Sequence, residues 1–410
     1  MPSWLVFALI ALLPTDAPRP PLVDFLGGPR TVVCLGDSVT GVYYHTGGLR
    51  AYPEMLEIAL RQHYPQATLR VVNAGISGHT TRLGLDRLER DVLAHRPDLV
   101  SVAFGLNDLT SIPLDAFRTN LVSIVERCRE IGAQVVLCTP NAVIDTAARP
   151  VGRLEEYCRI IRDVCAEKQV ALCDQYAAAM RLRADDAWAW RLTMSDEIHP
   201  NMDGHKRMAE ELAWTITGQR VKLLDLPPPP LPLRTTRQRI RNRMPLRVLA
   251  MPPFHDYLRA AILDALPDAG EVHLELFEWP VAGQSLAQIE QYAQETVRRQ
   301  KPDLVIVAVP IEAYTVDGRP LDHEPFVRSY SWIMNWALSF GTREWDCLIV
   351  HPAVACNVAA APHPHDDLVR RLVRAQDLSL IDRGPNDASS TETLFRQWMR
   401  NRLTESVIHP

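Results

Sequence analysis

Short apolar runs alternate with stretches of helical periodicity along the first half of the chain. The runs predict five strands, at 32–35, 69–73, 98–104, 134–139 and 170–174. Between them apolar residues recur every three to four positions, which predicts helices at 51–60, 117–128, 153–168 and 203–217, with another around Leu88–Leu93. Strands that alternate with helices form a parallel sheet covered on both faces, so the pattern predicts an α/β fold.

The same pattern returns in the second half of the chain. Arg96–Ala103 (RPDLVSVA) recurs as Lys301–Ala308 (KPDLVIVA), at an offset of 205 residues. Apolar runs at 247–251, 348–352 and 378–382 match earlier runs in the same order. The repeat predicts a second, smaller α/β domain of similar topology. An unrelated α/β domain whose buried strands have a similar composition is the alternative.

Composition divides the 410 residues into four segments. Residues 1–25 form a signal-like hydrophobic N-terminus, and residues 26–220 form the first expected domain. Residues 221–245 are a linker that contains Pro227–Pro232 and a run of arginines, which we expect to be a solvated face. Residues 246–410 form the second expected domain, since a chain of this length exceeds one ordinary core.

The N-terminus and the cysteines point to different compartments. Trp4–Leu13 is a run of ten apolar residues, too short to span a bilayer but suited to the core of a signal peptide, which favours an exported or periplasmic location over a cytoplasmic one. The eight cysteines form no C-x-x-C pair and are typical of small buried hydrophobic residues. A net charge of −5 gives no electrostatic basis for binding nucleic acid.

Polar residues follow the expected strands, at the edge where open α/β sheets bind ligands. The segments are Gly36-Asp37-Ser38, Asn73–Thr80, Gly105-Leu106-Asn107-Asp108 and Asp196–Pro200. An ester hydrolase needs a nucleophilic hydroxyl, an imidazole that takes its proton, a group that orients the imidazole, and donors for the oxyanion. Ser38, His199, Asp196 and the pair Gly78 and Asn107 can fill these roles.

The spacing of the acid and the histidine suits this chemistry. Asp196 lies three residues before His199, so one irregular or helical turn would let the carboxylate bind the ring Nδ1 while the other ring nitrogen faces Ser38. Pro200 disfavours a helical His199.

The four segments resemble, in order, the conserved blocks of the SGNH/GDSL hydrolase superfamily. The resemblance covers roughly residues 30–218, and Val39 stands where the nucleophile block usually has leucine. It implies a flavodoxin-like three-layer α/β/α fold and hydrolysis without metal or cofactor. It also implies Ser38, Asp196 and His199 as the catalytic residues, with an oxyanion hole made by the Ser38 and Gly78 amides and the Asn107 side chain. The chain has no G-x-S-x-G elbow, which argues against an α/β-hydrolase fold.

The predicted function is serine ester hydrolysis through an acyl-enzyme. Small acyl esters are the expected substrates, including O-acetyl groups on carbohydrates, because no long apolar loop suggests a tunnel for an acyl chain. An O-acyltransferase using the same site, or a non-catalytic protein that binds carbohydrate or a partner, are the alternatives. We expect no nucleic-acid partner and no membrane span, and the sequence leaves the oligomeric state open.

The second domain is predicted to be a degenerate, non-catalytic copy. Aligned with the first, it has Phe254 for the serine, Glu312 for the asparagine and Ser406 for the acid, and it ends before a closing helix. Such a copy could stabilise the first domain, cover its active site or bind substrate.

The remaining histidines are assigned to loops. His45 and His79 lie near the expected active-site loops, where we expect solvent-exposed side chains. His363–Asp367 resembles a metal-binding motif, but the proline between its two histidines predicts a plain loop.

Overall fold

Two parallel sheets organise the chain. The computed structural model describes residues 20–355, 363–384 and 387–404. The first sheet has the order β2-β1-β3-β4-β5. This is the flavodoxin-like order, as predicted. Its strands are β1 (Arg30–Gly36), β2 (Leu69–Gly75), β3 (Leu99–Ala103), β4 (Gln134–Cys138) and β5 (Ala171–Cys173).

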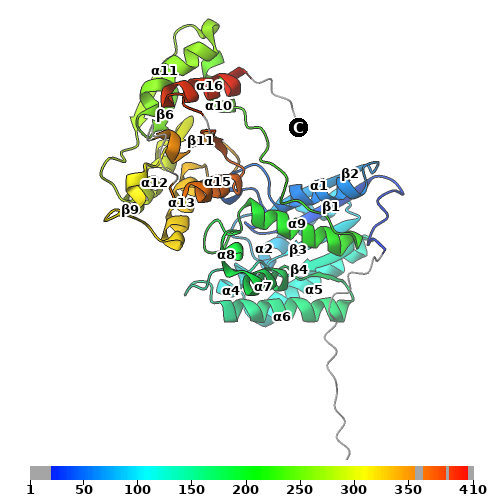
Figure 1. The fold of residues 1–410 in the computed structure, drawn as a ribbon. Helices are drawn as coiled ribbons and strands as arrows, with labels where there is room; N and C mark the ends of the chain where they lie inside the picture. The colour runs from blue at the N-terminus through cyan, green and yellow to red at the C-terminus, as the bar shows by residue number, and fades with distance from the viewer. Residues whose placement is uncertain (1–19, 356–362, 385–386, 405–410) are drawn as a thin grey trace, which may run out of the picture.

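Helices cover both faces of the first sheet. In Figure 1, α1 and α9 lie together in the upper part of the first domain, and α5 and α6 lie along its lower edge. The elements are η1 (Tyr44–Thr46), α1 (Tyr52–His63), α2 (Thr81–Asp86), α3 (Leu88–Asp91), η2 (Leu93–His95), α4 (Asp108–Ser111), α5 (Leu114–Glu130), α6 (Val151–Lys168), α7 (Gln175–Asp185), α8 (Ala187–Arg191) and α9 (Met202–Thr217). The apolar strand residues and the inner helix faces form one buried cluster between these layers.

The single helix expected around Leu88 is wrong. The segment is instead divided into α2, α3 and η2, with a break at Arg87, where φ is −104° and ψ is 4°. The Arg87 side chain turns inward and donates to the carbonyl of Gly36 at 2.9 Å. The apolar spacing is real, but an inward-facing arginine interrupts it.

Strand register brings the polar loops to one edge. Gly36, at the end of β1, pairs with Gly75 of β2 on one side and with Ala103 of β3 on the other. Gly75 lies so close to the loop after β1 that a Cβ there would stand 2.1 Å from the amide nitrogen of Gly41. A glycine is therefore required at this crossing, which holds the first two loops together.

The second sheet repeats the topology of the first. Its order, β7-β6-β8-β11-β12, is the same order when its strands are numbered from β6. The strands are β6 (Leu246–Ala250), β7 (Leu274–Glu278), β8 (Leu304–Val307), β11 (Asp346–Val350) and β12 (Ser379–Ile381). Its other elements are α11 (Phe254–Ala265), η3 (Pro267–Ala269), α12 (Leu286–Gln300), η4 (Ile311–Tyr314), the small hairpin β9 (Thr315–Val316) and β10 (Arg319–Pro320), α13 (His323–Ala337), α14 (Pro352–Ala355), α15 (Asp366–Arg374) and α16 (Thr391–Thr404). A second α/β domain is thus present, and it has its own buried core.

The expectation that this domain lacks a closing helix is wrong. α16 packs against α11, as α9 packs against α1 in the first domain. The stretch that leads into α16, as Asp196–Pro200 leads into α9, has no histidine after His365. The segment Ser406–Pro410, which resembles Asp196–Pro200, falls outside the described residues.

The arginine run of the linker forms a helix on the second domain. α10 (Arg234–Arg241) buries Thr236, Arg237 and Ile240. The amide of Thr236 donates to Asp346 Oδ2 at 2.8 Å, and Arg239 pairs with Asp303 at 2.9 Å. The run is therefore partly buried rather than a solvated face, and the boundaries at 220 and 245 stay predictions.

The signal-like run Trp4–Leu13 lies outside the described residues. Within the described part of the chain, no helix has the length and apolar character needed to cross a membrane. The seven described cysteines are buried, and none of them forms a disulfide with another described cysteine.

Candidate active site

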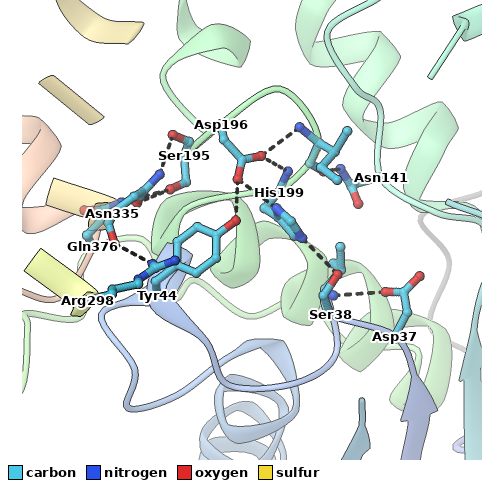
Figure 2. Close-up of polar contacts among 12 residues, drawn as sticks. Asp37, Ser38, Tyr44, Asn141, Ser195, Asp196, His199, Arg298, Asn335 and Gln376 are labelled. Atoms are coloured by element: carbon cyan, nitrogen blue, oxygen red, sulfur yellow. Dashed lines mark hydrogen bonds and ion pairs between the residues drawn. The ribbon is translucent and has the colours of Figure 1, made fainter. Parts of the chain in front are cut away.

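Ser38 stands in the loop after β1 and is nearly buried, with 9% of its surface exposed. Its Oγ lies 2.9 Å from Nε2 of His199, 161 residues further along the chain. Figure 2 shows the two side chains pointing toward one another, with Asp196 on the far side of the imidazole. The carboxyl of the neighbouring Asp37 points away and accepts from the Val39 amide at 2.9 Å, which fixes the turn that carries Ser38.

Asp196 and His199 form one tight turn between α8 and α9. Asp196 Oδ2 lies 2.8 Å from His199 Nδ1, and Oδ1 accepts from the amides of Ile198 and His199 at 2.8 and 2.7 Å. The amide of Ser195 donates to the carbonyl of His199 at 2.9 Å, which closes the turn. The carboxylate thus orients the ring through Nδ1 and leaves Nε2 facing Ser38, as the spacing predicts.

The electrostatics favour an ion pair in this turn. Burial disfavours the imidazolium, but the Asp196 carboxylate outweighs it and raises the pKa of His199 above its ordinary 6.5. Burial likewise opposes the Asp196 anion, yet His199 and the two backbone amides hold the pKa of that carboxyl below 3.8. A charged Asp196 beside a basic imidazole is the arrangement that a proton acceptor for Ser38 requires.

The predicted oxyanion donors lie beside Ser38. Gly78 and Asn107 line the same pocket as Ser38 and His199. The Asn107 amide is fixed at both ends: Nδ2 donates to the carbonyl of His79 at 3.0 Å, and Oδ1 accepts from Arg149 at 3.3 Å. Gly78 has φ of +76°, which an L side chain rarely adopts.

Two side chains that the sequence analysis did not single out hold the glycine loop. The Tyr43 hydroxyl accepts from the amide of Ser77 at 2.8 Å. Arg87 donates through Nε to His79 Nδ1 at 3.1 Å, in addition to its bond to Gly36. The loop that carries Gly78 is thus tied to the end of β1, where Ser38 begins its own loop.

His45 is not the solvent-exposed residue that we expect from its loop. It is fully buried, and its ring stacks on His199 at 4.5 Å and on His205 at 5.4 Å. Burial lowers the pKa of His45 well below 6.5, and the neighbouring His199 and His205 lower it further. His45 therefore presents a neutral ring face to His199, whereas His79 is partly buried and accepts a hydrogen bond from Arg87, so it too is less exposed than expected.

The pocket over Ser38 is small and reaches the second domain. Its volume is about 160 Å³, and besides Ser38, Gly78, Asn107 and His199 it is lined by Tyr43, Tyr44 and Phe340. Phe340 belongs to the loop between α13 and β11, and its ring centroid is 5.3 Å from that of Tyr43. No local sequence signal marks these aromatic residues, because their importance depends on the contact between the two domains.

No metal site emerges from the described ranges. They contain no group of three or more histidine, cysteine, aspartate or glutamate side chains that could hold a metal ion. The ring of His365 packs on Phe326 at 4.2 Å.

Comparison with known proteins agrees with this geometry. The model of the GDSL-like lipase/acylhydrolase family matches residues 34–207, a range that contains Ser38, Gly78, Asn107, Asp196 and His199. Residues 34–207 form a GDSL-like lipase/acylhydrolase domain.

Two relatives of this GDSL domain are esterases. An acetylxylan esterase of Geobacillus stearothermophilus is 29% identical over 210 residues, which are 45% of this chain and 92% of that protein. An arylesterase of Vibrio mimicus is 36% identical over 107 residues, 26% of this chain and 52% of the relative. Together with the family match, they identify the protein as a carboxylic ester hydrolase.

Solved structures of the same kind align with the GDSL half of the chain. A lipase/acylhydrolase from Enterococcus faecalis aligns with a TM-score of 0.40 and 28% identity, covering 47% of this chain and 98% of that one. A catalytic mutant of the acetylxylan esterase Axe2 from Geobacillus stearothermophilus aligns with a TM-score of 0.42 and 24% identity, covering 48% of this chain and 100% of that one.

Proposed function

We propose that the GDSL domain is a serine esterase in which Ser38 is the nucleophile, His199 the general base and Asp196 the group that orients it. The observation that carries the proposal is the continuous chain of contacts from Ser38 Oγ to His199 Nε2 at 2.9 Å and from His199 Nδ1 to Asp196 Oδ2 at 2.8 Å. Both contacts are within hydrogen-bond distance, which is the geometric requirement for a nucleophile and its base.

The reaction has two steps. Ser38 Oγ attacks the acyl carbon while its proton passes to His199 Nε2, and the oxyanion accepts hydrogen bonds from the Ser38 and Gly78 amides and from Asn107 Nδ2. The bond to the alcohol then breaks, His199 protonates the leaving oxygen, and the acyl group remains on Ser38. Water attacks the acyl-enzyme, again giving its proton to His199, and the acid leaves as Ser38 recovers its proton.

We propose small acyl esters as the substrates, with O-acetyl groups on carbohydrate as the first class to examine. The volume of the pocket, about 160 Å³, suits a short acyl group rather than a long chain. The Geobacillus relative is an acetylxylan esterase, which supports the same substrate class.

We also propose that the second domain is a non-catalytic copy of the GDSL fold. The shared strand order supports a common topology. At the position that aligns with Ser38 stands Phe254, which is fully buried at the start of α11. A domain without a hydroxyl at that place, and without a histidine between His365 and its closing helix, lacks the nucleophile and the base that the GDSL domain has at these places.

The test is hydrolysis of p-nitrophenyl esters of graded chain length, alongside a panel of acetylated polysaccharides. Wild type should prefer the acetyl ester, and Ser38→Ala should lose essentially all turnover. Ser123→Ala is the control, because Ser123 lies on α5 and its hydroxyl donates to the carbonyl of Thr119 in the same helix. Esterase activity remaining in Ser38→Ala would overturn the assignment of Ser38 as the nucleophile and the proposal that the second domain is non-catalytic.

Labelling with a fluorophosphonate separates the alternative functions. An esterase or an acyltransferase should label at Ser38 and should lose labelling in His199→Ala. A folded wild type that takes up no label would overturn the catalytic proposal in favour of a binding protein. Release of acetate in water without an added alcohol acceptor supports the hydrolase, whereas product that appears only with an acceptor supports acyl transfer.

A further inference from the structure

The segment that carries Asp196 and His199 is attached to the second domain on both sides. Before it, Ser195 Oγ donates to Asn335 Oδ1 at 2.9 Å, and Asn335 Nδ2 donates to the carbonyl of Ser195 at 3.2 Å. After it, the amide of Met202 donates to the carbonyl of Ala375 at 2.6 Å. The acid and the base of the site thus lie between two anchors that belong to the other domain.

The anchor at Ser195 is a buried polar network. Gln376 Nε2 donates to Ser195 Oγ at 2.8 Å and also contacts Asn335 Oδ1. Ser195 is 2% exposed, Asn335 0% and Gln376 1%. Away from water such bonds are strongly directional, and a missing partner leaves a polar group unsatisfied, so the network fixes the position of the residue next to Asp196.

Tyr44 makes the third connection, and it reaches the carboxylate itself. Its hydroxyl donates to Asp196 Oδ2 at 3.1 Å, the same oxygen that faces His199 Nδ1. Figure 2 shows Tyr44 between Asp196 and Arg298. Although Tyr44 belongs to the GDSL half of the chain, its side chain is part of the buried core of the second domain.

Arg298 and Trp332 of the second domain hold the Tyr44 ring. The Arg298 guanidinium lies 4.9 Å from the ring centroid, and the Trp332 ring stacks on it at 6.4 Å. Arg298 is itself fixed by two backbone carbonyls, donating to Leu338 at 3.0 Å and to Asn335 at 2.9 Å. A cation over the face of a tyrosine is attractive, so the second domain determines where the Tyr44 hydroxyl lies.

We propose that the second domain keeps the acid and base of the GDSL domain in their catalytic arrangement, and that Tyr44 is the positioning residue through which it acts on Asp196. The proposal rests on the proposed function. It gives the non-catalytic domain a role in the reaction: without it, the turn at 195–202 and the second hydrogen bond to Asp196 Oδ2 lose their support.

The charged groups around this site define what a change at Tyr44 would do. His199 faces Asp37 and Asp196, which favour its protonated form, and Arg149, which opposes it. His45 and His205 also adjoin it, and both are held neutral by burial, which lowers the pKa of each.

Tyr44 itself stays protonated. Burial, then the Asp196 carboxylate, raise the pKa of Tyr44 far above 10, while Arg298 lowers it and Glu197 raises it slightly. Glu197 is in turn 3.6 Å from Arg328 of the second domain. Tyr44 is therefore a hydrogen-bond donor to Asp196 throughout the working pH range.

The first test is Tyr44→Phe, which removes the hydroxyl and keeps the ring. The Tyr44 hydroxyl donates a hydrogen bond to Asp196 Oδ2 and so partly neutralises its negative charge. Without this bond, the oxygen should stabilise the protonated His199 ring more strongly and raise the pKa of His199. We expect kcat to fall by about tenfold, with the acidic limb of kcat/KM moving to higher pH by about half a unit. A residue of purely structural importance would lower stability without moving the limb.

The second test separates the domain from the tyrosine. Arg298→Met keeps the length of the side chain but removes its charge and its two bonds, and it should shift the limb in the same direction as Tyr44→Phe, by less. Arg259→Met is the matched control, since Arg259 also bonds a backbone carbonyl of the second domain, that of Val272 at 2.7 Å, away from Tyr44. If the acidic limb of kcat/KM lies at the same pH in Arg298→Met and Arg259→Met, the positioning role of the second domain is wrong.

An NMR titration of the His199 Nδ1 proton makes the result independent of turnover. If wild type hydrolyses esters but neither its limb nor its Nδ1 titration differs from that of Tyr44→Phe, the proposal is wrong while the esterase stands. If wild type hydrolyses no ester, the proposed function fails, and the titration alone decides the positioning role: a higher midpoint in Tyr44→Phe supports it and an unchanged midpoint overturns it.

Discussion

Gly78 combines a conformational requirement with a chemical one. Its φ of +76° lies in the left-handed region, and a Cβ added there would meet no atom within 4 Å. Space therefore does not exclude a side chain at this position, but backbone strain does. The same backbone carries the amide that we assign to the oxyanion, so strain at Gly78 should disturb the direction in which that amide points.

Gly78→Ala should lower both stability and turnover. We expect a loss of about 1 kcal/mol of unfolding free energy and a fall in kcat of about 10- to 100-fold as the amide shifts. Gly132→Ala is the matched control, because Gly132 has φ of +86°, also has no atom within 4 Å of an added Cβ, and follows α5 at the opposite end of the strands from Ser38. Equal losses of activity in the two variants would contradict the role of the Gly78 amide.

His199 gives the activity a predictable dependence on pH. The base must be neutral to take the proton of Ser38, so kcat/KM should rise with pH through the pKa of His199. Asp196 raises the pKa of His199 above 6.5, which places the midpoint of the acidic limb above that value. In Asp196→Asn, the residual activity should have its limb at lower pH, since the charge that raised the pKa is gone; a limb that stays in place would contradict this assignment. The profile is measured with an acetyl ester whose leaving group does not titrate in the range.

At the scale of elements, Arg87 connects the two loops that meet at the nucleophile. Its guanidinium reaches Gly36 at the end of β1, His79 in the glycine loop and Asp91 in α3. The side chain is buried, with 5% of its surface exposed. It stands at the break between α2 and α3, and it ties the loop that carries Gly78 to the end of β1, which Ser38 follows.

Arg87→Met should therefore weaken catalysis, although Arg87 is not one of the residues that line the pocket. We expect kcat to fall by about tenfold, because two hydrogen bonds that fix the glycine loop are lost. Arg90→Met is the control: Arg90 pairs with the same Asp91, but its side chain is 73% exposed, and an exposed ion pair contributes little. Ester hydrolysis and thermal unfolding are measured on both variants, and equal kcat values would exclude Arg87 as a support of the loop.

The elements that the sequence predicts best are those with buried apolar periodicity. The strands of the first sheet, the strands β6, β8, β11 and β12 of the second, and the helices α1, α5, α6 and α9 follow the expected ranges within a few residues, whereas no apolar run in the sequence analysis corresponds to β7. α7 was not predicted, since it buries only Gln175 and Tyr176 and so has little apolar spacing to detect.

The site residues also divide into those that a local sequence pattern predicts and those that it does not. Ser38, Gly78 and Asn107 follow strand ends, and Asp196 and His199 lie three residues apart, so local pattern suffices for them. Tyr44 bonds a residue 152 positions away, and Ser195 bonds one 140 positions away. The first contact joins distant segments of the GDSL domain and the second joins the two domains, and no local spacing records either one. The same holds for His45: its polar loop predicts a solvent-exposed side chain, but the rings of His199 and His205 pack against it.

At the scale of the whole molecule, two domains of one topology have different tasks. Figure 1 shows the second domain above the GDSL domain, close to α9 and α8. Arg50 of the first domain and Asp377 of the second form a two-pronged ion pair in which the carboxylate is fully buried. Removing one partner of such a pair would leave the other charge buried and uncompensated, so both residues are needed where the two domains meet. A fixed interface is what allows a loop of one domain to line the pocket of the other.

The packing of the second domain against the GDSL domain should affect acyl-chain specificity through Phe340. It lines the pocket over Ser38, lies 5.3 Å from the ring of Tyr43 and 5.9 Å from that of Tyr44, and is half-exposed. Phe340→Ala should enlarge the pocket and raise kcat/KM for butyryl and hexanoyl esters relative to the acetyl ester, by about 5- to 50-fold, since each added methylene that finds apolar contact contributes roughly 1 kcal/mol.

Leu276→Ala is the control for this change. Leu276 lies on β7 of the same domain, is 44% exposed and is not part of the pocket lining. It should leave the chain-length profile as in wild type, which separates an effect of the pocket from a general effect of trimming an apolar side chain on this domain. The measurement is kcat/KM across the p-nitrophenyl series for the three proteins. An unchanged profile in Phe340→Ala would mean that the acyl group binds away from the domain interface, and the small pocket would then have to be explained by Tyr43 and His45 alone.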